Sequence, residues 1–503
     1  MSPKLIKYSA YGLLILFSPL LFLTLGTYFN WFGVYEDAGD IVQDGRSYLI
    51  SSNEINEPTS ESAKQILFGD LHVHSTFSLD AFLGNLPIVR GEGVHPVSDA
   101  CNFARFCSNL DFFAITDHAE WLTSREWKDT ISSVQDCAFA SRDSDNPPII
   151  PLLGWEWTQK SINKSSHYGH KNVILRSIES DAIPLRPIGA EGKFFENLLN
   201  MPVSTMLYAS LYDFKNRQNY FNVMHRKLIT NNLNRCSADK PVRDLPVDCI
   251  ERAISPEVLF NKLDDWGYDA IVIPHGTAWG NSAPPLAAWD TQLNKKDHNQ
   301  NYQKLIELYS GHGNTEEYRS WRTLNNNKEA LSCPQPSPGF IPECHQAGEI
   351  IRERCRVAAG SLEECDKRAR AARQNYVSVN PFGLLTVPGS DPEEWLNSGQ
   401  CLDCFLPAFN YRPQMSAQYA LAIRDFTSGE PEGYRFGFIG SSDNHQSRPG
   451  TGYKEVLRYL NSDSKYSSKN NFLLSMGPKK EPQLPSTKIL DLKKFEDRIS
   501  MPR

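Results

Sequence analysis

Histidine and carboxylate residues recur at short spacings in this sequence, and the first group is the densest. The segment Asp70–Ala81 reads Asp-Leu-His-Val-His-Ser-Thr-Phe-Ser-Leu-Asp-Ala. Residues two apart in an extended chain project to the same side, so Asp70, His72 and His74 are expected to converge. Imidazole nitrogens and carboxylate oxygens are common ligands of divalent metal ions. The spacing therefore predicts part of a metal site.

Later apolar runs end in the same residue types. Four of them are followed within a few residues by a histidine or glutamate, at His118, Glu156, His275 and His445. His170 opens a further run, and His167 lies three residues before it. Because the ends of α/β strands collect functional groups at one face of a barrel or sheet, the combined pattern predicts a site for several metal ions at that face.

The apolar runs themselves predict an α/β protein. Seven of them have the length and composition of strands: Gln65–Val73, Asp111–Thr116, Ile149–Leu153, His170–Leu175, Asp269–Ile273, Leu305–Tyr309 and Phe436–Gly440. Their alternation with helical and loop segments is typical of βα units around a mainly parallel sheet. Two connections, Ser177–Lys262 and Asn314–Arg435, are longer than ordinary βα loops. We expect them to be insertions, the second rich in cysteine and containing a helix over Glu349–Gln374.

The N-terminus contains a segment that could enter a membrane. Lys4 and Lys7 precede the uncharged stretch Tyr8–Tyr35, which is long enough to cross a bilayer. This pattern predicts an export signal, either cleaved or retained as an anchor in the inner membrane, with the rest of the chain in the periplasm or another extracytoplasmic space. The expected layout is a signal or anchor, a polar tether, a main domain and a peripheral tail, at residues 1–35, 36–64, 65–460 and 461–503.

Cysteine usage agrees with export. The chain has 11 cysteines, six of them between Cys333 and Cys404, and such density favours disulfides in an oxidising compartment. Cys236 and Cys249 are expected to form a local pair. One odd thiol is left in the group Cys101, Cys107 and Cys137.

Composition excludes several classes of protein. The 52 Lys and Arg residues and the 59 Asp and Glu residues leave a net charge of −7, so no basic surface for nucleic acid is expected. A hydrophobic content of 40% is compatible with a folded core rather than disorder. The sequence also lacks the G-x-x-x-x-G-K-[ST] string of nucleotide-binding P-loops.

The motifs together resemble those of the polymerase and histidinol phosphatase (PHP) superfamily of metal-dependent phosphoesterases. The matching strings are D-L-H-V-H-S-x-x-S-x-D-A, I-T-D-H, P-H-G and S-D-N-H, at Asp70–Ala81, Ile115–His118, Pro274–Gly276 and Ser442–His445. The resemblance implies a distorted seven-stranded (β/α) barrel with two or three divalent ions, Zn, Mn or Fe. The long insertions and the strings Ile306–Glu316 and Ser447–Glu455 resemble a large, often exported branch catalogued as a domain of unknown function.

Carried over residue by residue, the resemblance implies nine metal ligands. They are His72, His74, Asp80, His118, Glu156, His170, His275, Asp443 and His445. Glu156 would bridge two ions. Asp80 stands where many relatives have histidine, and His167 is an alternative to His170 as the ligand near the fourth strand.

Such a centre would catalyse hydrolysis, with a metal-bound hydroxide attacking phosphorus while the ions neutralise the developing charge. The expected protein is an exported phosphoesterase for a small, phosphorylated ester. Asp117 and His312 are candidate acids, although Asp117 could instead orient a ligand histidine. Arg448 and Glu316 are candidate substrate contacts. Two alternatives stay open: a metallohydrolase of non-phosphate esters, lactones or amides, and a metal-binding protein without activity.

Overall fold

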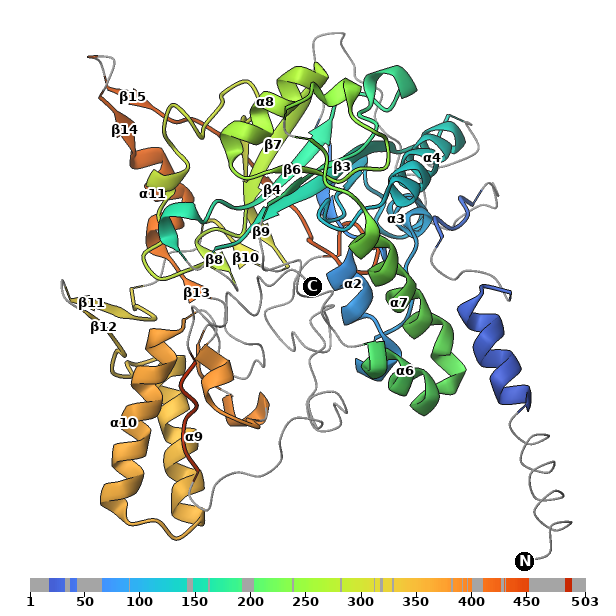
Figure 1. Ribbon diagram of the computed structural model, residues 1–503. Helices are drawn as coiled ribbons and strands as arrows, with labels where there is room; N and C mark the ends of the chain where they lie inside the picture. The colour runs from blue at the N-terminus through green and yellow to red at the C-terminus, as the bar shows by residue number, and fades with distance from the viewer. Residues whose placement is uncertain are drawn as a thin grey trace, which may run out of the picture.

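A curled half-barrel of strands, surrounded by helices, forms the main body of this mixed α/β protein (Figure 1). The structure is a computed structural model. It describes residues 18–31, 37–42, 66–89, 91–142, 148–161, 163–191, 203–237, 239–280, 283–311, 313–316, 320–327, 330–380, 383–390, 392–395, 397–399, 410–426, 429, 431–451 and 485–490.

The first sheet has five strands in the order β1-β2-β3-β4-β7. Their bounds are Gly69–Val73, Phe112–Ile115, Ile150–Gln159, Gly169–Leu175 and Ala270–His275. Strands β1, β2 and β3 pair in parallel, whereas β4 pairs antiparallel with both β3 and β7. The expectation of a mainly parallel sheet is therefore wrong at β4. Residues 160–168 are too few for the crossover that a parallel neighbour of β3 would need.

The second sheet has the order β13-β8-β10-β9-β16. Its longer strands are β9 (Leu305–Ser310) and β16 (Gly437–Gly440), which pair in parallel. The short strands β8, β10 and β13 span Trp279–Gly280, Gly313–Asn314 and Asn410–Tyr411. All seven predicted strands thus form. The closed seven-stranded barrel is not confirmed, because these seven strands are divided between the two five-stranded sheets. An isolated bridge from Val73 to Asn444 links the end of β1 to the loop after β16.

Three helices cover the first sheet and close the main core. They are α3, α4 and α8, at Val97–Phe103, Ser124–Ala140 and Pro256–Trp266. Their apolar sides meet Trp155, Trp157 and Val272, all fully buried. The first helical turn of α4 is fixed by a capping box between Thr123 and Glu126. This core holds the strand ends that carry the predicted ligands.

The first predicted insertion folds against the edge of this body. It contains α6 (Val203–Tyr212), α7 (Arg217–Asn232), β5 (Ile188–Ala190) and β6 (Glu251–Ala253). The helices α6 and α7 share an apolar cluster with α2 (Leu79–Gly84) and the residues that follow it. The insertion therefore supports the segment on which Asp80 lies.

The second predicted insertion contains a disulfide-bonded helical hairpin. Helices α9 (Glu343–Val357) and α10 (Leu362–Ser378) lie side by side (Figure 1). The expectation of one continuous helix here is wrong. Ala359 has a φ of 60°, and the Ser361 side chain accepts a hydrogen bond from the Glu364 amide, so the chain reverses between the two helices. The short elements β11, β12, α11, β14 and β15 span Asn325–Asn327, Ala330–Ser332, Ala417–Ala422, Arg424–Asp425 and Glu432–Gly433.

Four disulfides cross-link the described chain. They join Cys101 to Cys137, Cys236 to Cys249, Cys333 to Cys344 and Cys355 to Cys365. The predicted pair Cys236–Cys249 is confirmed, and Cys107 is the odd thiol of its group. Cys401 and Cys404 lie outside the described residues. Four disulfides are consistent with an extracytoplasmic location.

The N-terminal prediction is tested only in part. Residues 18–28 are helical, whereas residues 1–17 and most of the tether and tail fall outside the described residues. None of the helices in the described ranges has both the length and the apolar character needed to cross a membrane.

Candidate metal centre

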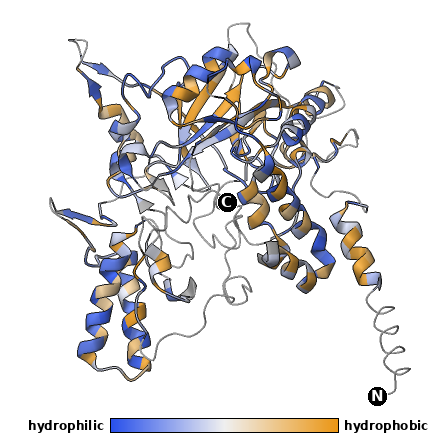
Figure 2. Ribbon diagram, viewed as in Figure 1, coloured by the Kyte–Doolittle hydropathy of each residue, from blue (hydrophilic) through white to orange (hydrophobic). Residues whose placement is uncertain are grey.

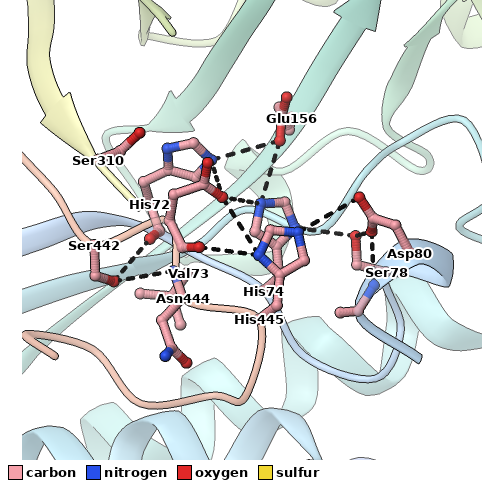
Figure 3. A network of polar contacts seen from close by, with 12 residues as sticks. His72, Val73, His74, Ser78, Asp80, Glu156, Ser310, Ser442, Asn444 and His445 are labelled. Atoms are coloured by element: carbon pink, nitrogen blue, oxygen red, sulfur yellow. Dashed lines mark hydrogen bonds and ion pairs between the residues drawn. The ribbon is translucent and has the colours of Figure 1, made fainter. Parts of the chain in front are cut away.

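Side chains from seven strands or their end loops converge on one region, part of which Figure 3 shows. They form four overlapping groups that could hold a metal ion: His74, Asp80, His118 and His445; His72, His275 and Glu307; His72, His74 and Glu156; and Glu156, His170 and His275. Within each group the ligand atoms lie within 4.8 Å of one another. The ninth predicted ligand, Asp443, joins them because its Oδ1 is 3.2 Å from His72 Nε2 and 3.3 Å from His74 Nε2.

Two buried carboxylates hold the end of β1 in place without joining these groups. Asp70 accepts hydrogen bonds from the amides of Ser442 (3.0 Å) and Gly450 (2.7 Å). Asp117 accepts from the amide and the hydroxyl of Ser75, both at 2.7 Å. Burial raises the pKa of both carboxyls. The prediction that Asp70 forms part of the metal site with His72 is therefore wrong. Asp70 instead fixes the loop after β16.

That loop brings two further ligand candidates to β1. The Asp443 amide donates to the His72 carbonyl at 2.9 Å, and the His74 amide donates to the Asn444 carbonyl at 2.8 Å. Asp443 has a φ of 52°, in the left-handed region that aspartate adopts more readily than most residues. The turn at Asp443 and these backbone bonds place Asp443 and His445 beside the histidines of β1.

Glu156 contacts histidines from several strands, and Figure 3 shows its contacts with His72 and His74. One carboxylate oxygen is 3.2 Å from His74 Nε2 and 3.5 Å from His72 Nε2. The other is 2.5 Å from His170 Nδ1 and 3.3 Å from His275 Nε2. The first oxygen is also 3.5 Å from His118 Nδ1. Because its two oxygens face different sets of imidazoles, the geometry suits the predicted bridging role of this carboxylate.

Asp80 is positioned by the start of α2. It lies in the first turn of that helix, and its Oδ1 accepts a hydrogen bond from the hydroxyl of Ser78 at 3.0 Å. Its Oδ2 is 2.9 Å from His118 Nε2 and 3.4 Å from His445 Nε2. An aspartate at this position thus reaches the same neighbours that a histidine ligand would need.

Two carboxylates near the ligands were missed by the sequence analysis. Glu307 on β9 is 1% exposed, and its Oε2 lies 3.0 Å from His72 Nδ1. Glu120 Oε2 lies 3.7 Å from His118 Nδ1, and its Oε1 accepts from the amides of Thr158 and Ala190. Glu307 was detectable as a charged residue inside an apolar run, a position where an acid is seldom buried without a partner. Glu120 gave no comparable signal.

Several buried nitrogen atoms in the described cluster fit metal ligation. His72 Nε2, His74 Nε2 and both ring nitrogens of His275 make no well-formed hydrogen bond, although buried polar atoms are nearly always paired. Carboxylate oxygens of Glu156 and Asp443 lie 3.2–3.5 Å from the three Nε2 atoms. Burial alone would lower the pKa of His118, but Asp80 and Glu156 outweigh it and raise the pKa to about 9. The carboxylates beside His118 therefore favour a positive charge at that position. The imidazole and carboxylate donors of the cluster suit Zn, Mn or Fe.

The structure distinguishes the two candidates near the fourth strand. His170 belongs to a ligand group with Glu156. His167 belongs to none of the groups found among the described residues, and its Nδ1 accepts from the Ser161 amide at 3.2 Å. Burial and the neighbouring Lys160 lower the pKa of His167 to about 3. The geometry therefore favours His170.

The predicted acids and substrate contacts lie in different settings. His312 falls outside the described residues. Asp117 contacts Ser75 rather than a ligand histidine. Glu316 accepts from the Tyr309 hydroxyl at 3.1 Å, and Arg448 Nη2 lies 2.6 Å from Glu92 Oε2. Substrate contacts by Glu316 and Arg448 stay predictions.

Comparison with models of known families gives one match for this chain. Residues 61–318 match the family described as "Protein of unknown function (DUF3604)". The match contains the ligand candidates from His72 to Glu307 and ends before Asp443 and His445. Neither the curated proteins nor the solved structures gave a match.

Proposed function

The chain belongs to the DUF3604 family of proteins of unknown function, and we propose from its site that it is an exported metal-dependent phosphoesterase. The convergence of imidazoles and carboxylates around Glu156 carries this proposal. Ligand candidates come from segments as distant as β1 and the loop after β16, so their meeting is a property of the fold rather than of one local motif.

The order of the ligand candidates along the chain supports membership of the PHP superfamily. The histidine pair on β1, the histidine after β2, the glutamate on β3 and the Asp-x-His of the last loop follow the order of the superfamily motifs. We also propose a PHP-type seven-stranded barrel, in which β7 is next to β9. These two strands are in contact in the structure.

The chemistry of the proposal rests on how these residues handle charge and protons. Divalent ions held there would acidify water and neutralise charge on an ester. Glu156 would orient its five neighbouring imidazoles, and Glu307 would hold the His72 ring through Nδ1, leaving Nε2 for ligation. His312 is the proposed acid for the leaving group, and Asp117 is a positioning residue for the segment after β1.

Lys160 favours a phosphate ester over a neutral ester as substrate. It directly follows β3 and is partly exposed. Burial lowers the pKa of its ammonium group, whereas the nearby carboxylates of Glu156, Asp80 and Asp443 raise it. An ammonium group beside the ligand carboxylates can contact an anionic substrate at the point where a phosphate would meet the ions.

The cellular location is part of the same proposal. Uncharged residues from Tyr8 to Tyr35 follow two lysines, which supports export with the N-terminus on the cytoplasmic side. Four disulfides agree with an oxidising compartment. We propose that this segment anchors the protein to the inner membrane.

A substrate screen tests the proposal. Full-length protein is depleted of metal, reloaded separately with Zn, Mn or Fe, and assayed on phosphate monoesters and diesters, carboxylic esters and lactones. We expect metal-dependent hydrolysis of a phosphate ester. Activity confined to carboxylic esters or lactones would replace phosphate in the proposal, and metal loading without any hydrolysis would favour a binding protein.

A charge variant sharpens this test. Lys160→Gln should lower kcat/KM for the best phosphate ester about 10- to 100-fold, as expected for losing a charge-assisted contact, with metal content unchanged. Lys164→Gln is the matched control, because Lys164 is an exposed lysine in the neighbouring turn Lys164–Ser166. Equal activities in the two variants would remove Lys160 from the substrate site.

A further inference from the structure

We propose that α6 and α7 form a membrane-binding face that lies on the surface of a lipid bilayer. The face is defined by Leu207, Tyr208, Leu211, Tyr212, Leu228 and Ile229, which are 39–66% exposed. It is separate from the metal centre, and no proposed ligand belongs to it.

Helix α6 supplies most of this face. Residues Val203–Tyr212 contain no charged side chain. Leu207, Tyr208, Leu211 and Tyr212 follow an i, i+1, i+4, i+5 spacing, which places them on one side of the helix. Met206 and Ala209, on the other side, are buried in the cluster shared with α2. The exposed side of α6 is therefore an apolar stripe on a helix whose opposite side is already packed.

Helix α7 also exposes apolar side chains, and lysines lie on it and in the turn before it. Leu228 and Ile229 are 39% and 52% exposed. Lys215 is exposed in the turn between the two helices, and Lys227 is partly exposed on α7. An apolar and aromatic face bordered by lysines is typical of helices that lie in the interface of a membrane with anionic lipids.

The N-terminal helix indicates which partner covers this face. Arg217 Nε of α7 donates to Thr27 Oγ1 at 3.0 Å, and the Tyr28 ring lies 5.1 Å from His225 and 6.3 Å from Phe221. Helical residues 18–28 continue directly from the uncharged stretch that begins at Tyr8. A segment of that composition partitions into lipid. The contacts that Thr27 and Tyr28 of this helix make with α7 would therefore bring α7 to the bilayer surface.

The N-terminal helix also leaves large apolar side chains exposed. Leu21, Phe22, Phe29 and Trp31 are 57–59% exposed, and Figure 2 shows hydrophobic residues on this helix and on α6. Soluble proteins seldom expose several large apolar groups of this kind to water on one element. Tyrosine and tryptophan favour the membrane interface. With ten residues, α6 is too short to cross a bilayer, so it is placed at the surface.

Photo-crosslinking tests the proposal in the full-length protein. Benzoylphenylalanine replaces Tyr208 or Tyr212, and the protein is reconstituted into vesicles of phosphatidylethanolamine and phosphatidylglycerol. Phe426 is the matched control, because it is an aromatic residue, 71% exposed, that directly follows β14. Strand β14 lies on the opposite side of the molecule from α6 in Figure 1.

We expect lipid adducts at positions 208 and 212 and none at 426. Adducts between two copies of the chain, or no lipid adduct at either tyrosine position, would overturn the proposal. Hydrogen exchange provides a measurement without a label: the amides of α6 should exchange more slowly with vesicles than without them, and unchanged exchange would also contradict it. Hydrolysis of a soluble ester by the same samples is a separate readout, so failure here leaves the metal centre untouched.

Discussion

His72 illustrates how individual residues organise the site. Its ring lies between Glu307 at Nδ1 (3.0 Å) and Glu156 and Asp443 at Nε2 (3.5 and 3.2 Å). A carboxylate on one ring nitrogen fixes the orientation of an imidazole and increases its basicity at the other. The structure thus gives Glu307 a role in orienting His72 that does not require direct ligation.

Replacing Glu307 tests this role. Glu307→Gln retains the size of the side chain but removes the negative charge that orients His72. We expect metal affinity to fall about 10- to 100-fold, the usual cost of losing such a partner, as measured by competition with a chromogenic chelator. Glu316→Gln is the control, because Glu316 contacts Tyr309 outside the ligand groups. Wild-type metal affinity in Glu307→Gln would show that His72 does not need the Glu307 carboxylate at Nδ1 to bind metal.

The segment after β1 is held by an arginine from another element. Arg226 of α7 donates to the carbonyl of Thr76 at 2.8 Å and to that of Phe77, and its Nε lies 3.1 Å from Glu126. Both charged side chains are 2–3% exposed. The first insertion therefore fixes the segment that leads from His74 to Asp80.

Removing this arginine should destabilise the fold. Arg226→Met leaves Glu126 buried without its ion pair, a change that typically costs about 3–5 kcal/mol. Guanidinium unfolding of the full-length chain measures the difference. Arg235→Met is the matched control, because its pair with Glu191 is exposed and should contribute less than about 1 kcal/mol. Equal small losses in both variants would contradict a supporting role for Arg226.

The elements also show what sequence patterns could and could not predict. Apolar runs predicted all seven strands because burial dictates their composition. The direction of β4 depends on the length of one connection, which hydrophobic pattern does not encode. The break at Ala359 was missed because the residues on both sides favour a helix. Glu307 was missed because it lies inside a strand, whereas metal ligands were expected at strand ends.

At the scale of the whole molecule, the disulfides report the compartment in which the chain folds. In the described part of the chain, eight of the 11 cysteines are paired and Cys107 is free. Cys401 and Cys404 lie outside the described residues. We expect no more than these three to react when protein from its native host is denatured and alkylated without reductant, as counted by mass spectrometry. Alkylation of all 11 would contradict folding in an oxidising compartment.

We expect this chain to bind a cluster of metal ions, and elemental analysis measures that binding. Full-length protein is purified without chelator, reconstituted with Zn, Mn or Fe, and analysed by inductively coupled plasma mass spectrometry beside His72→Ala. We predict about two or three divalent ions per chain in the wild type and a clear loss in the variant, with circular dichroism unchanged. Less than one ion per wild-type chain after reconstitution with each metal would show that these side chains do not form a site for several metal ions.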